Sequence, residues 1–142
     1  MLRVVAQLPY GALYRLGRPL GGLARRMASG RARIAARNIE LCFPELDADA
    51  RERLLAKHFE SLGISLFEIP FTWWGPERRF ESLADISGLE NLAEAAQAGK
   101  GVLLLSAHFT CLEIGGRLLV RRVRFDAMYR PSENPVVEYV MS

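Results

Sequence analysis

The chain has 142 residues, half of them apolar, with a formal net charge of +3 at pH 7. This length fits one domain. No apolar run reaches the ~18 residues that a membrane-spanning helix needs, so the composition fits a protein that touches a membrane without crossing it in this segment. The two cysteines, Cys42 and Cys111, have no metal-ligand spacing and are expected to be free thiols.

Positive charge is concentrated at the start of the chain. Residues 1–37 contain eight arginines and no acidic residue. At ~100° per residue, apolar side chains form one helical stripe and arginines face the other way; the stripe is Leu13, Leu16, Leu20, Leu23 and Met27. Residues 1–37 are therefore predicted to be a basic amphipathic segment that lies on an anionic membrane, with a second domain over residues 38–142.

Other interpretations of this segment stay open. The stripe could equally pack against the rest of the domain and leave the arginines solvated. A signal peptide is disfavoured because Pro9, Arg15 and Arg18 interrupt any apolar core. Nucleic-acid binding is a weaker alternative, since no recognised module accompanies the basic stretch.

Helices are expected through the middle of the chain. Asp47 and Asp49 are candidate N-caps for a helix that continues to Leu62. An aromatic cluster follows, in which Trp73 and Trp74 fit a bilayer interface, a cover over an acyl groove or ordinary core packing. A short helix is predicted for residues 89–98, where a glycine stops it.

A short apolar run ends in a histidine, and a glutamate follows five positions later. Residues 102–105 (Val-Leu-Leu-Leu) read as a buried parallel strand, and His108 and Glu113 follow it. Residues just past such a strand end face the crevice where open α/β sheets bind ligands. An imidazole there can take a proton from a hydroxyl, and a nearby carboxylate can orient it.

Two other interpretations concern the same turn. Thr110 and Glu113 also fit a capping box at a helix N-terminus, which leaves His108 without a chemical role. Cys111 could be proposed as a nucleophile, but we favour a small apolar residue on the buried face of the helix.

A second strand is predicted at residues 124–129, joined to the first by a helix over residues 110–120. The predicted fold class is α/β, with N-terminal helices followed by a βαβ unit. Because a two-stranded parallel sheet cannot bury both its faces, the unit is expected to be an incomplete fragment of a larger domain. Another helix is predicted to start near Asn134.

Four ordered blocks resemble one known family. They are Arg37-Asn-Ile-Glu-Leu-Cys-Phe-Pro-Glu45, Gly88-Leu-Glu-Asn-Leu92, Gly99 to Leu105 running into His108-Phe-Thr-Cys-Leu-Glu113, and Tyr129-Arg-Pro-Ser-Glu-Asn-Pro135. Together they are similar to the late acyltransferases of bacterial lipid A biosynthesis, a branch of the H-x4-D/E lysophospholipid acyltransferases. That family implies a glycerolipid-acyltransferase-like αβα domain in a protein about twice as long, so this chain is expected to be its N-terminal half and inactive alone.

The resemblance also implies a reaction. His108 is expected to be the general base and Glu113 its partner, with acyl–acyl carrier protein as donor and a lipid A precursor as acceptor. Arg130 is the candidate phosphate contact, with a salt bridge to Glu133 as the alternative. No metal or cofactor is implied, because the thioester already carries the activation.

The expected location is the cytoplasmic face of the inner membrane. The alternatives are transfer to a glycerophospholipid or aminoacyl lipid, and an inactive membrane-binding remnant.

Overall fold

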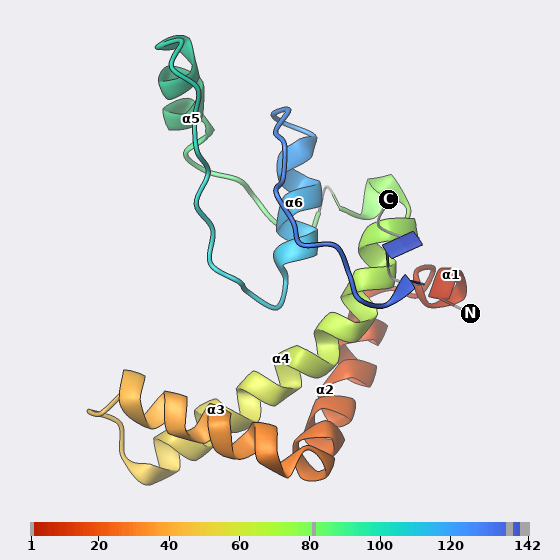
Figure 1. Cartoon of the computed structure of the whole chain (residues 1–142). Coiled ribbons are helices and arrows are strands. Elements are labelled where there is room, and N and C mark those ends of the chain that lie inside the picture. Colours follow the sequence, from red (N-terminus) through yellow and green to blue (C-terminus); the bar gives the residue numbers. More distant parts are fainter. Residues whose placement is uncertain (1, 81, 136–137, 140–142) are drawn as a thin grey trace.

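The computed structural model describes residues 2–80, 82–135 and 138–139 (Figure 1). These residues form six α-helices and one 3-10 helix, and no strand is found among them. In chain order the elements are α1 (Leu2–Val5), α2 (Tyr10–Met27), α3 (Ser29–Cys42), α4 (Ala48–Trp74), η1 (Glu77–Arg79), α5 (Leu89–Gln97) and α6 (Leu112–Val120).

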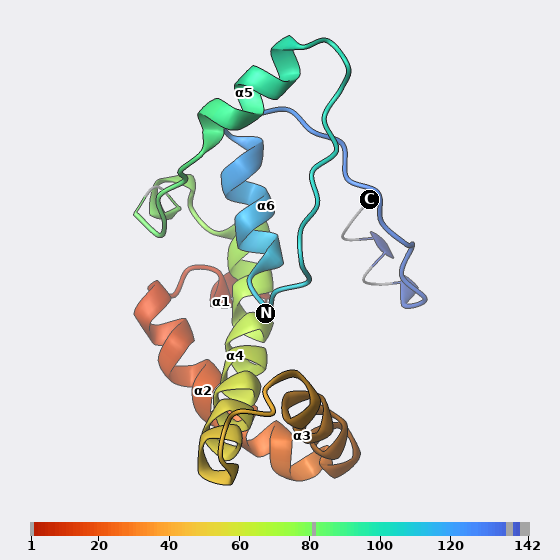
Figure 2. The ribbon, with the colours of Figure 1, turned by 90° about the vertical axis from the view of Figure 1, so that its left-hand side faces the viewer.

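Helix α4 is the central element, and α1, α2, α3 and α6 all pack against it (Figures 1 and 2). It begins where the sequence predicts, because the Asp47 carboxylate accepts a hydrogen bond of 2.7 Å from the amide of Ala50. It continues well past Leu62, through an internal proline at Pro70, and stops at Gly75. The aromatic cluster is therefore the last part of this helix.

Glycines set the crossing of α2 and α4. A Cβ placed on Gly21 would lie 2.0 Å from the Phe59 carbonyl oxygen, and one on Gly17 would lie 2.5 Å from the Ile64 Cα. Across the contact, a Cβ on Gly63 would lie 2.1 Å from the Gly17 carbonyl oxygen. Rising numbers on α2 meet falling numbers on α4, so the helices are antiparallel, and their backbones approach as only glycine allows.

An aromatic core closes one end of this pair. Leu13, Phe71 and Phe80 are fully buried together. The rings of Phe71 and Phe80 have centroids 4.8 Å apart, and Tyr10 lies 5.9 Å from Phe71. Such tilted pairs stabilise a core beyond the area that they bury.

The apolar stripe predicted on α2 is divided by this packing. Leu13 is buried, whereas Leu16 and Leu23 are about half exposed and Met27 is 78% exposed. The face in contact with α4 is centred on the glycines, which a stripe defined by large apolar residues does not reveal. No described helix is long and apolar enough to span a bilayer.

The predicted α/β fold with a βαβ unit is wrong. Neither residues 102–105 nor residues 124–129 form a strand, and Leu103 and Leu105 are 93% and 96% exposed. An apolar run of four residues becomes a strand only when a neighbour supplies its ladder of hydrogen bonds, and no described segment pairs with either run. The connecting helix is real, although α6 begins at Leu112 rather than at Thr110.

Two further predictions concern helices of the second half. Helix α5 ends at Gln97, close to the predicted end, and Gly99 follows with φ of 68°. This helix stands away from the α2–α4 pair in both views and buries no residue (Figures 1 and 2). The helix expected near Asn134 falls largely on residues 136–137 and 140–142, which lie outside the described residues.

Candidate active site

Helix α6 carries Glu113 in its first turn and is fastened to the end of α4 by one arginine. Arg117 donates hydrogen bonds to the Thr72 carbonyl and, at 2.6 Å, to the Glu77 carboxylate. Its guanidinium also lies 4.4 Å from the centre of the Phe80 ring. Arg121 adds a second ion pair to Glu77 at 3.0 Å. These contacts fix where α6 begins relative to α4.

The contact with Arg117 also lowers the pKa of the Glu77 carboxyl. The hydrogen bond from Arg117, followed by the nearby charges of the two arginines, lowers the pKa of Glu77 below its usual value. Glu77 therefore stays ionised at any pH near neutral, and the anchor of α6 persists there.

The candidate partner residue Glu113 lies against α4. The indole N–H of Trp73 is 3.5 Å from a Glu113 carboxylate oxygen, at the long limit for a hydrogen bond. Trp73 and Trp74 meet edge to face with centroids 5.7 Å apart. Both rings are only partly buried, and Trp73 faces the predicted catalytic carboxylate.

The candidate base His108 lies in the extended segment that leads into α6. Its side chain is exposed, and no hydrogen bond joins it to Glu113 or to any other described residue. The turn after it is held by backbone bonds from the Phe109 amide to the Ala107 carbonyl and from the Leu112 amide to the Phe109 carbonyl. The dyad of His108 and Glu113 thus stays a prediction. His108 lies just before α6, and Glu113 lies in its first turn.

Two alternative interpretations of this turn are wrong. The capping box does not form, because Cys111 is the N-cap of α6 and no side chain caps the helix there. Cys111 is exposed rather than on the buried face. The late start of α6 puts Thr110 and Cys111 into the turn itself.

Arg130 lies on the surface. Its guanidinium is 2.9 Å from the Glu133 carboxylate, and both side chains are more than four-fifths exposed. A pair this exposed contributes little to stability and is easily replaced by another anion. The structure therefore has the salt-bridge alternative, and contact with a phosphate stays a prediction.

Sequence reasoning missed a buried acid. Glu68 is 5% exposed, and the Tyr10 hydroxyl donates a hydrogen bond to it. Burial, and then this bond, raises the pKa of Tyr10 above its usual range. One helical turn on, the hydroxyl of Thr72 is buried without a described hydrogen-bond partner. A carboxylate inside the apolar run of residues 67–71 was the available signal.

The described residues bring together no group of three or more His, Cys, Asp or Glu side chains that could hold a metal ion.

Comparisons with known proteins give one consistent result. The family model described as "Bacterial lipid A biosynthesis acyltransferase" matches residues 1–142. The chain is 38% identical over 142 residues to the lipid A biosynthesis lauroyltransferase of Escherichia coli (strain K12), covering 100% of this chain and 46% of that relative. It is 40% identical over 136 residues to the palmitoleoyltransferase of the same organism, covering 96% and 44%.

A third relative agrees. The lipid A biosynthesis acyltransferase of Haemophilus influenzae is 32% identical over 142 residues, covering 99% of this chain and 45% of the relative. The chain thus spans less than half the length of the curated relatives it matches. No solved structure matches it at a significant level.

Proposed function

Because the chain belongs to the bacterial lipid A biosynthesis acyltransferase family, we propose that it takes part in moving a fatty acyl chain onto a hydroxyl of a lipid A precursor. The donor is the thioester of an acyl carrier protein. The observation that carries this proposal is the family match over all of residues 1–142, which include every block that first suggested the resemblance.

His108 is the general base of this reaction. As the acceptor hydroxyl attacks the thioester carbonyl, the imidazole takes its proton. The carbon–sulfur bond then breaks, and the carrier thiolate takes the proton back from the imidazolium. Glu113 orients the ring and offsets its positive charge.

Two observations support these roles. His108 is exposed, so an acceptor bound at the surface can reach it. Glu113 lies on a helix that Arg117 holds against the end of α4, and the Trp73 indole N–H lies 3.5 Å from its carboxylate, so the backbone that carries this acid is held in place. Catalytic hydrogen bonds are often loose without substrate, and the missing bond between the two residues is compatible with the dyad.

Membrane association belongs to the same proposal. The arginine-rich segment of residues 1–37 holds the protein on an anionic lipid surface, at the cytoplasmic face of the inner membrane. That surface presents the acceptor lipid. Arg130 contributes a phosphate contact by exchanging Glu133 for the acceptor.

A chimera tests the reaction. Residues 1–142 replace the aligned part of the Escherichia coli lauroyltransferase, and transfer from acyl–acyl carrier protein to a lipid A precursor is measured. His108→Ala in the chimera should lower the rate at least ~10²-fold, and Glu113→Ala by a similar or smaller factor, as expected for loss of a base and its partner.

The chain offers a matched control, because His58 is its other histidine. His58 is exposed on α4, edge to face with Phe59 at 5.5 Å. His58→Ala should leave transfer unchanged. An active chimera that tolerates His108→Ala equally well would refute the assignment of the base.

A further inference from the structure

A groove runs along α2, where α3 and α4 form its other walls. Its volume is about 1000 Å³, and arginine is the most frequent residue type in its lining. Four arginines come from α2, namely Arg15, Arg18, Arg25 and Arg26, and Glu60 is the acidic residue among the lining side chains.

Several residues with short side chains also line the groove. They are Gly22 of α2, Ala32 of α3 and Ala56 of α4. A Cβ added at Gly22 would meet no atom within 4 Å, in contrast to the neighbouring Gly21, which is pressed against α4. The next residue along α2 thus faces open space.

Two of the arginines are held by α4. Arg18 donates two hydrogen bonds to Glu60, at 2.9 and 3.2 Å, and Arg25 donates one of 2.8 Å to Glu52. The carboxylates of Glu60 and Glu52 are thus already paired with Arg18 and Arg25.

The other two arginines keep their charge available. In the described part of the chain, Arg15 and Arg26 have no ion pair or side-chain hydrogen bond. They are eleven residues apart, which is about three helical turns, so they share one face roughly 16 Å apart along the axis. Residues 1–37 contain no acidic residue that could neutralise them.

The ligand that fits is a phosphate group. A guanidinium fork matches phosphate oxygens and binds them by two charged hydrogen bonds. The first residue of α3, Ser29, also lines the groove, and no side chain caps that helix. Its free N–H groups add to the positive potential.

Apolar neighbours indicate that this phosphate belongs to a lipid. Leu16 and Leu23 are about half exposed and Met27 more so, and on a helical projection the three lie about a quarter-turn from Arg15 and Arg26. A helix lying in the headgroup layer needs this pairing, with apolar side chains reaching the acyl region and cations at the phosphates. An acidic protein surface would not need the apolar flank.

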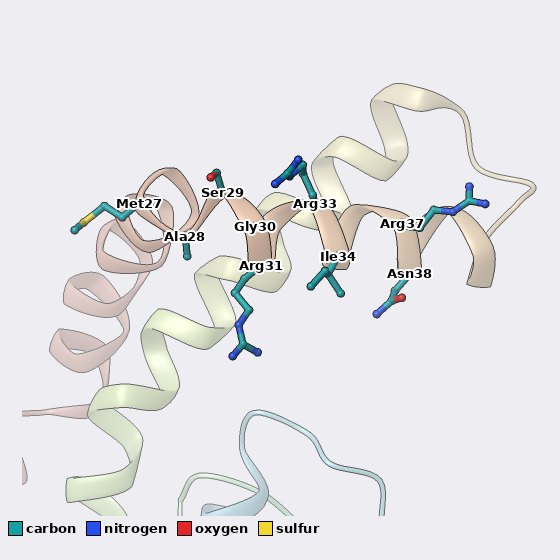
Figure 3. A pocket seen from close by; sticks show the side chains of 9 residues that line it. All are labelled: Met27, Ala28, Ser29, Gly30, Arg31, Arg33, Ile34, Arg37 and Asn38. Carbon is teal, nitrogen blue, oxygen red and sulfur yellow. The ribbon is translucent and has the colours of Figure 1, made fainter.

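A second basic hollow, of about 760 Å³, does not have this construction. It lies at the corner of α2 and α3 and includes Arg31, Arg33 and Ile34. Figure 3 shows Arg33 pointing to the opposite side of α3 from Arg31 and Ile34. Arg31 and Arg33 therefore do not share one face of the helix, unlike Arg15 and Arg26, and they serve as the control.

We propose that the groove between α2, α3 and α4 binds anionic lipid headgroups, with Arg15 and Arg26 each contacting a phosphate. This proposal rests on the proposed membrane association and gives it a defined site. Arg18 and Arg25, fixed by their glutamates, shape the walls, and Gly22 leaves the space that the phosphate occupies.

The first test compares two charge losses of equal size. Binding of the 142-residue chain to phosphatidylcholine vesicles, with and without phosphatidylglycerol, is measured by co-sedimentation. Loss of any two cations at the surface should weaken binding to the anionic vesicles about ten-fold or more, since each contributes about 1 kcal/mol. Arg15→Gln/Arg26→Gln should weaken binding several-fold further, because these two guanidinium groups also bind phosphate by charged hydrogen bonds. Arg31→Gln/Arg33→Gln should show only the general loss that follows from removing two surface cations. Equal losses for both double variants would overturn the proposal.

The second test leaves the charge unchanged. Gly22→Leu fills the groove, and Gly11→Leu adds the same side chain to an open position on α2 outside it. Both should fold, because leucine favours a helix over glycine and neither position is crowded; circular dichroism checks this. Gly22→Leu alone should lose the preference for anionic vesicles. If it keeps that preference, the proposal fails.

Other ligands give distinct results. Inorganic phosphate that displaces the chain from vesicles at millimolar concentration would make this a site for free anions and overturn the lipid assignment. Binding of poly-glutamate that Arg15→Gln/Arg26→Gln abolishes, with vesicle binding unaffected, would assign the groove to an acidic protein instead. A wild-type chain that binds no vesicle would refute membrane association itself, whereas unequal behaviour of the variants tests only the groove.

Discussion

The contact between Gly21 and the backbone of Phe59 makes a strong prediction about stability. In Gly21→Ala the new methyl group would lie 2.0 Å from the Phe59 carbonyl oxygen, 2.6 Å from its carbon and 2.9 Å from the Glu60 Cα. All three atoms belong to the backbone of a helix, so no side chain can rotate away. The two helices must separate, which weakens the packing along their whole crossing.

The expected magnitude is the sum of two opposing effects. Overpacking in a tight contact costs about 1–3 kcal/mol, and a clash between two backbones is expected at the upper end, about 3 kcal/mol. Alanine regains about 1 kcal/mol of helix propensity. Gly21→Ala should therefore lower the free energy of unfolding by about 2 kcal/mol. Gly22→Ala, one residue on and unobstructed, should raise it by up to about 1 kcal/mol.

Urea unfolding followed by circular dichroism measures both variants under the same conditions. Opposite signs at adjacent glycines are the signature of the close crossing, because propensity alone predicts the same gain at both. If Gly21→Ala and Gly22→Ala stabilise the chain equally, the helices do not approach as closely as described, and the account of the α2–α4 pair is wrong.

Three further changes test other contacts. Asp47→Ala should cost about 1 kcal/mol in urea unfolding, because it removes the N-cap of α4. Tyr10→Phe leaves Glu68 buried without its hydrogen-bond donor and should cost about 1–3 kcal/mol in the same assay. The lowered pKa of Glu77 predicts stability that is present above its unfolded-state pKa and lost as pH falls through the folded-state pKa. Arg117→Met should reduce the fall in melting temperature between neutral and acidic pH, measured by thermal unfolding at a series of pH values.

Local signals predicted two helix boundaries well, the start of α4 and the end of α5. The N-cap aspartate before α4 and the glycine after α5 act within a few residues of where they stand, so a single sequence reveals them. The family, too, could be recognised from its ordered blocks, and the comparisons confirm it.

Local signals could not show whether the two predicted strands form. A run such as residues 102–105 has no period that separates a strand from other extended chain, and its state depends on a distant partner. The predicted strands therefore failed where the local helix signals succeeded.

In the candidate site, too, the features set by local sequence were predicted, whereas the contacts between residues far apart in the sequence were not. Glu113 falls on a helix as expected, but the anchoring of that helix by Arg117 joins residues 45 positions apart. The Tyr10–Glu68 contact spans 58 positions. The packed face of α2 was partly mistaken because close contact there is made by glycines, whereas a hydrophobic pattern counts large side chains.

The central place of α4 has a consequence for the order of events during synthesis. Helix α2 leaves the ribosome first, while the part of α4 that covers Leu13 and Gly17 is translated roughly a few seconds later. During that interval the face of α2 that packs on α4, which includes Leu13, has no partner. The nascent chain thus exposes this apolar face most before α4 is complete, and the arrival of α4 then determines which face of α2 is buried.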